Sequence, residues 1–198
     1  MLRSLLCVMI LAIAAARASY AEVIEVRHVE LEAAEDGYLL NADFSMELNA
    51  RLEEALNNGV SLYFVVEFEL TRPRLLWFDE MTARERLQVR LAYQPLLRTY
   101  RLSTGTLSQS FASLADALRA LGQVRGWAVF ERARVRPELS YTASVRMRLD
   151  TDLLPRPFQV SALTSREWSL ASDWMRLPFN PVAEGERGAR TGVEPTAK

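Results

Sequence analysis

The stretch that decides the fold is VSLYFVVEFELTR, residues 60–72. Apolar or aromatic side chains occupy every second position from 62 to 70, and Tyr63, Glu67 and Glu69 lie between them. Successive side chains of a strand point to opposite faces of its sheet, so this alternation predicts one buried face and one polar face. A strand with one solvated face is typical of an antiparallel sheet.

The same alternation recurs along the chain on both sides of this stretch. It predicts strands over 23–32, 38–46, 60–72, 86–93, 97–103, 106–111, 127–132 and 140–150. An Asp-Gly pair at 36–37 and a Thr-Gly pair at 104–105 supply the turns of two hairpins. The chain is therefore expected to be mainly β, with about eight strands.

Two short helices are predicted in the connections between strands. Asn49 caps the first, which Asn58 and Gly59 end. Ser113 opens the second, with Asp116 in the reciprocal capping position. This pattern favours an antiparallel β-sandwich, with an immunoglobulin-like topology as one form of it. The alternative is an α+β arrangement with both helices on one face of a single sheet.

The end of the folded part is predicted to be extended. Pro155 and Pro157 bracket a crossing, because proline cannot donate a hydrogen bond to a neighbouring strand. Closing strands are expected over 159–163 and 168–176. Residues 180–198 hold glycines, prolines and scattered charges, so a disordered tail is expected after one domain at 22–179.

The N-terminus is predicted to be a cleavable signal peptide over 1–21. Arg3 precedes an apolar run over 5–16, and small residues follow at 16–18 and 19–21 as two candidate cleavage sites. Such a run spans about 18 Å as a helix, short of a ~30 Å hydrocarbon core, so an uncleaved anchor is the lesser alternative. Cys7 lies inside this segment, so the exported chain has no disulfide.

The composition excludes several classes of function. Lys and Arg together number 24 against 25 Asp and Glu, which gives no general attraction to nucleic acid. The sequence holds one lysine, Lys198, one cysteine and one histidine, His28. A phosphate-binding lysine loop, a thiol nucleophile and the usual zinc ligand sets are therefore not expected. We assign no catalytic, cofactor or metal-binding residue, and we expect no enzyme.

Carboxylate chemistry survives these exclusions, since glycoside cleavage needs only two suitably spaced acids. The candidate pairs are Glu67 with Glu69, Asp79 with Glu80, and Asp150 with Asp152. For the first pair, the plainer interpretation is a set of surface ion pairs with Arg86 and Arg90 on the neighbouring strand.

Two groups of residues are candidate interaction surfaces. Arg72, Arg74, Trp77 and Phe78 lie at or just after the end of the central strand and have the composition of interface hot spots. The plainer interpretation is that the aromatic pair covers one end of the sandwich. Four outward arginines form a cationic stripe if their strands are neighbours, and such a stripe suits carboxylate or phosphate groups. These arginines are Arg86, Arg90, Arg146 and Arg148. The alternative is that they are solvated and paired with glutamates.

Several stretches resemble one protein family. They are NNGV at 57–60, VEFEL at 66–70, RPR at 72–74, WFD at 77–79, QSF at 109–111, VRMRLD at 145–150 and LTSREW at 163–168. The chain is similar over 23–178 to the domain of unknown function 4390, whose members are proteobacterial and carry signal peptides. The resemblance implies a periplasmic location and an accessory role beside a nitrogen-regulation type of sensor kinase. It brings no catalytic residues.

These observations together predict an exported, periplasmic protein that binds an envelope or inner-membrane protein, with no transmembrane span after signal cleavage. A second hypothesis is a binder of an anionic small molecule or envelope glycan on the arginine-rich sheet face. A third is a carboxylate-dependent hydrolase or lyase.

Overall fold

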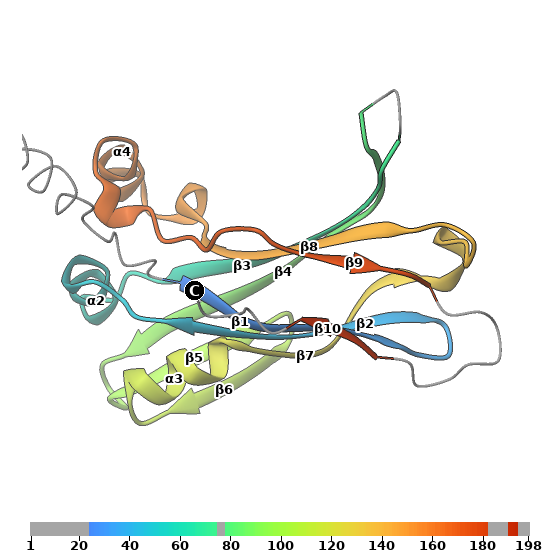
Figure 1. Ribbon diagram of the computed structural model, residues 1–198. Helices are drawn as coiled ribbons and strands as arrows, with labels where there is room; N and C mark the ends of the chain where they lie inside the picture. The colour runs from blue at the N-terminus through green and yellow to red at the C-terminus, as the bar shows by residue number, and fades with distance from the viewer. Residues whose placement is uncertain (1–23, 75–77, 182–189, 194–198) are drawn as a thin grey trace, which may run out of the picture.

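Alternating side chains build two antiparallel sheets that pack face to face (Figure 1). The computed structural model describes residues 24–74, 78–181 and 190–193. The strands are β1 (Ile24–Ala33), β2 (Gly37–Met46), β3 (Leu62–Arg72), β4 (Glu80–Gln94), β5 (Thr99–Thr104), β6 (Leu107–Phe111), β7 (Gln123–Glu131), β8 (Tyr141–Leu149), β9 (Met175–Phe179) and β10 (Arg190–Val193). The helices are α2 (Ala50–Asn57), α3 (Leu114–Leu121) and α4 (Arg156–Thr164), with single 3-10 turns η1 (Arg132–Arg134), η2 (Thr151–Leu153) and η3 (Arg166–Trp168).

The arrangement of the strands is a sandwich. One sheet has the order β10-β1-β2-β7 and the other the order β6-β5-β4-β3-β8-β9. The prediction of a mainly β, antiparallel sandwich is confirmed, and the alternative of a single sheet is wrong. No helix in the described part of the chain has the length and apolar character that crossing a membrane requires.

The core lies between the two sheets. The even-numbered residues of β3 from Leu62 to Leu70 are buried, as the alternation predicts. They meet apolar side chains of β1, β2 and β7 in one cluster. Within it, the rings of Tyr38 and Phe130 stack with centroids 4.9 Å apart, and Phe179 of β9 meets Tyr38 edge-on at 5.0 Å. These contacts join both sheets through aromatic packing.

The strand order matches that of a variable-type immunoglobulin sandwich except at one strand. In that fold one sheet contains strands A, B, E and D, and the other contains G, F and C with two strands, C′ and C″, added at its edge. Here β1-β2-β7 matches A-B-E and β9-β8-β3-β4-β5 matches G-F-C-C′-C″. The departure is β6, which stands in the place of D but pairs with β5 and leaves β7 at an edge. Gly105, at φ +56°, permits the tight turn that folds β6 back onto β5.

Both predicted helix caps are present. The Asn49 side chain accepts a hydrogen bond from the backbone N–H of Leu52, and that of Ser113 accepts one from Asp116. The Ser113 hydroxyl also donates to the Asp116 carboxylate at 2.7 Å. A side chain that satisfies an otherwise free backbone donor fixes where a helix begins.

The prediction for residues 155–176 is wrong in two respects. The segment expected as an extended crossing and a strand over 159–163 is α4, and the strand expected over 168–176 begins only at Met175, as β9. Pro157 is the second residue of α4, in the first turn, where a helix does not need the N–H that proline lacks. The helix is fixed by contact of its Phe158 ring with the buried Trp168, at 5.2 Å between centroids.

The stretch 180–198, expected as a disordered tail, contributes one ordered element among its described residues. Strand β10 pairs antiparallel with β1, from Val29 opposite Val193 to Glu32 opposite Arg190. The predicted signal peptide, 1–21, lies outside the described residues.

Candidate functional site: the outer face of the six-stranded sheet and the β3–β4 arm

Glu67 lies at the centre of the outer face of the six-stranded sheet. Strand β3 runs between β4 and β8, so Glu67 is opposite Arg86 on one side and Arg146 on the other. Arg146 Nε donates to Glu67 Oε2 at 2.6 Å, Arg148 Nη2 lies 3.3 Å from Oε1, and Arg86 Nε lies 3.4 Å from Oε1. The predicted cross-strand pair of Glu67 with Arg86 is therefore present, but Glu67 is only 5% exposed and so is buried and not at the surface.

The arginines keep Glu67 ionised. Burial raises the pKa of Glu67, but hydrogen bonds from Arg146 and Arg148 and the charges of both guanidinium groups outweigh it, so the pKa lies below the ordinary value. A general acid needs the opposite displacement, toward neutral pH. The arrangement therefore suits a charge anchor and does not suit an acid catalyst.

In each of the other two candidate carboxylate pairs, one acid is bound by arginine and the other is exposed to solvent. Asp150 lies 3.5 Å from Arg148, whereas Asp152 is exposed in η2. Glu80 is bound by Arg72 and Arg74, and Asp79 beside it is exposed. Within the described residues, no three His, Cys, Asp or Glu side chains lie close enough together to hold a metal ion.

Trp174 completes the cluster around Glu67. The guanidinium carbon of Arg146 lies 4.4 Å from the centroid of the Trp174 ring, which is a cation–π geometry. Sequence reasoning missed this partner. The register offers a signal in retrospect, because Ser144 pairs with Arg176 and the antiparallel count places Trp174 opposite Arg146.

The four arginines predicted as a stripe share this outer face, but β3 separates them. Arg86 and Arg90 belong to β4, and Arg146 and Arg148 belong to β8, with Glu67 between them. Arg90 donates to the hydroxyl of Ser61 at 2.9 Å, not to a glutamate. Glu69 pairs with Arg84, at 2.8 Å.

We call this surface the basic face. On its described strands and directly after β8, seven arginines share it with three carboxylates. The arginines are Arg84, Arg86, Arg90, Arg101, Arg146, Arg148 and Arg176, and the carboxylates are Glu67, Glu69 and Asp150. The near-neutral composition of the chain therefore conceals a cationic surface.

The opposite outer surface has the reverse balance. On β1, β2 and β7, four carboxylates share it with two arginines and His28, and we call it the acidic face. The carboxylates are Glu25, Glu30, Glu32 and Asp43, and the arginines are Arg27 and Arg125. Arg27 lies 2.9 Å from Glu25, and His28 lies 3.8 Å from Glu30.

Strands β3 and β4 continue beyond the sandwich as a paired arm, which rises away from the four-stranded sheet (Figure 1). The prediction placed the β4 strand at 86–93 and missed its first half, because a single buried side chain there, that of Ala83, gives no alternation. Arg72 and Arg74 both bind Glu80, and the hydrogen bond from Arg74, with the two charges, lowers the pKa of that carboxyl.

The end of the arm exposes apolar side chains. Phe78 is 96% exposed and Met81 is 43% exposed, so the interpretation that Phe78 covers one end of the sandwich is wrong. Trp77, the other aromatic residue of this prediction, lies outside the described residues. The described part of the arm thus carries a solvent-exposed aromatic ring close to a cluster of two arginines and one glutamate, which keeps a net positive charge.

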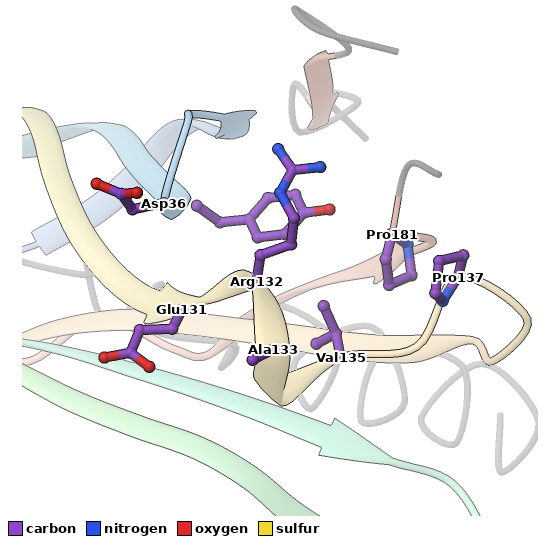
Figure 2. A pocket seen from close by; sticks show the side chains of 8 residues that line it. Asp36, Glu131, Arg132, Ala133, Val135, Pro137 and Pro181 are labelled. Carbon is purple, nitrogen blue, oxygen red and sulfur yellow. The ribbon is translucent and has the colours of Figure 1, made fainter. Parts of the chain in front are cut away.

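A cavity of about 770 Å³ lies at the end of the sandwich where β2 begins and β7 ends. Its lining includes Asp36, Glu131, Arg132, Val135 and Pro181. Figure 2 shows the carboxylates of Asp36 and Glu131 directed away from Pro137 and Pro181, so the two acids do not converge on a common point. Arg132 is occupied by the carbonyl of Ala34, at 2.8 Å. We find no catalytic arrangement in this cavity.

These features define the class of the protein: an antiparallel β-sandwich with a variable-type strand order, a basic outer face and a projecting hairpin. The chain belongs to the family described as a domain of unknown function (DUF4390), whose model matches residues 21–178. The resemblance predicted from the sequence is thereby confirmed. No curated protein and no solved structure matches the chain.

Proposed function

We propose that this chain is an exported periplasmic protein that acts by binding, and that its arm contacts an envelope or inner-membrane protein. The observation that carries the proposal is Phe78, whose ring is 96% exposed at the end of a paired arm. Burial of a large, solvent-exposed apolar side chain by a partner lowers the free energy of the complex. Aromatic residues beside arginines are the residues that dominate binding at interfaces.

The geometry of the arm supports a docking role. Past the buried pair of Leu70 and Ala83, pairing of Thr71 with Met81 and of Arg72 with Glu80 carries the strands beyond the core. The Glu80 bridges to Arg72 and Arg74 join the two strands near the end. Phe78 lies only two residues before β4, and a contact residue close to a paired element loses less conformational freedom on binding than one in the middle of a long open loop.

The test is crosslinking in living cells with a tag at the C-terminus, followed by mass spectrometry of the captured proteins. We compare the native chain with Phe78→Ser and Trp77→Ala. Leu96→Ser is the matched control, because Leu96 is fully exposed in the turn between β4 and β5. We expect one envelope protein to be captured by the native chain and by Leu96→Ser, and to be lost in both arm variants. Retention of that protein by Phe78→Ser would show that the arm is not the contact.

The second candidate function is binding of an anionic small molecule or envelope glycan on the basic face. The excess of arginines over carboxylates there favours it, since a planar guanidinium matches carboxylate and phosphate groups. A ligand that binds only the folded state raises the melting temperature. We expect cell-wall fragments with acidic groups to raise it for the native chain and less for Arg90→Gln. No shift with any acidic fragment removes this candidate.

A further inference from the structure

Three features of the molecule lie on the same side of the six-stranded sheet. Figure 1 shows the β3–β4 arm and α4 rising from this sheet, both on the side away from the four-stranded sheet. The arm continues one end of β3, whereas η2 and α4 follow the backbone hydrogen bond from Asp150 to Tyr63 at the other end. The basic face lies between them.

Both projections carry exposed apolar side chains. The arm has Phe78 and Met81, and the segment at the other end has Leu153 and Val160, which are 44% and 65% exposed. Of the seven large apolar side chains that are exposed among the described residues, four belong to these two projections. This side of the molecule therefore differs from the others in having the basic face between two apolar projections.

Several arginines of the basic face are exposed and can contact a partner. The Arg84 and Arg86 side chains are more than half exposed although both contact glutamates. Arg90 and Arg176 are exposed as well. Arginine binds phosphate oxygens through paired N–H groups, and clustered cations are attracted to anionic lipid surfaces.

We propose that this side of the sandwich docks on the surface of an anionic lipid bilayer. Phe78, Met81 and Leu153 enter the headgroup region, and the arginines of the basic face bind lipid phosphates. The basic face is complementary in charge to an anionic lipid surface, and apolar side chains lie on both sides of it. This combination favours a lipid surface over an acidic protein, because interfacial binding adds burial of apolar area to electrostatic attraction. The inference rests on the proposed function, since it uses the same arm and brings it to a membrane where an inner-membrane partner lies.

The test is cosedimentation of the purified protein with vesicles of phosphatidylcholine alone or with about one-third phosphatidylglycerol. We expect binding to the anionic vesicles only, and weaker binding as salt is raised. The double variant Arg90→Gln with Arg176→Gln is expected to bind about tenfold more weakly. The matched control, Arg27→Gln with Arg125→Gln, removes the same charge from the acidic face and is expected to bind like the native chain.

The apolar part has its own comparison. Phe78→Ser is expected to weaken vesicle binding, whereas Leu96→Ser is not. Circular dichroism checks that each variant is folded, and Arg84→Gln replaces Arg90→Gln or Arg176→Gln on the basic face if either does not fold. Equal binding to neutral vesicles, equal losses in the two double variants, or no binding at low salt would overturn the proposal.

Failure of this inference is distinguishable from failure of the proposed function. If Phe78→Ser loses its crosslinked partner while the native chain ignores anionic vesicles, the contact is with a protein and the lipid inference is wrong. Capture of an acidic protein by the arginines of the basic face, without vesicle binding, has the same meaning.

Discussion

The two outer faces of the sandwich differ in how their charged side chains are paired and how deeply they are buried. On the acidic face, charged side chains pair in small groups near solvent, as Arg27 does with Glu25 and Arg125 with Asp43. On the basic face, one carboxylate, Glu67, is buried by three arginines and by the neighbourhood of Trp174. Exposed ion pairs contribute little to stability, whereas a buried charge must keep its partners. The comparison teaches that charge on one face is dispensable and on the other is structural.

The largest difference is expected when the central carboxylate is removed. Glu67→Gln leaves three arginines without their shared anion, and we expect it to lower the free energy of unfolding by about 2 kcal/mol. Glu25→Gln on the acidic face is the matched change and is expected to cost less than about 0.5 kcal/mol. Urea unfolding of the three proteins measures both. Equal losses would mean that Glu67 is no more structural than a surface glutamate.

Lowering the pH tests the structural role of Glu67 in a second way. The pKa of Glu67 is lower in the folded chain than its ordinary value of 4.5, so the unfolded chain binds more protons as the pH falls. The stabilisation is fully present above about pH 5 and is lost as the pH drops through the folded pKa. The stability gap between the native chain and Glu67→Gln is therefore expected to shrink below pH 4.5, as thermal unfolding from pH 7 to pH 3 would measure. A gap that is constant with pH would contradict an ionised Glu67.

A smaller effect is expected from the ring beside this network. Trp174→Ala removes the cation–π contact with Arg146 and part of its cover, and we expect a loss of about 1 kcal/mol. Trp174→Phe keeps a ring and is expected to recover part of the loss. If the loss in Trp174→Ala persists after Arg146→Gln is added, the two side chains are not coupled.

Much of the fold was predictable because it depends on local pattern. The alternation in β3, the Asn49 and Ser113 caps and the glycine turns each act within a few residues. The arm and α4 were missed for a physical reason. In the first half of β4 only Ala83 is buried, so no alternation shows there. Pro155 precedes α4 and Pro157 lies in its first turn, and prolines in these places are equally compatible with a helix start.

The candidate site was predictable only in its parts. The alternation in the sequence placed Glu67 and the arginines on the correct, outer face of the sheet, but it did not predict that Glu67 is buried. Burial of Glu67 depends on side chains about eighty residues further along the chain, at Arg146 and Arg148. That pairing depends on strand order, which alternation does not encode. The exposure of Phe78 likewise follows from the length of the arm.

The move of β6 to the larger sheet has a consequence for self-association. It leaves β7 as an edge strand, and an edge strand is a template on which further chains can add and aggregate. The register of β7 shifts twice against β2, and Gly126 within it has φ +58°. Such irregular backbone interrupts the regular row of donors and acceptors that an incoming strand needs. The edge created by this change of partner is thus poorly suited to growth of a fibril.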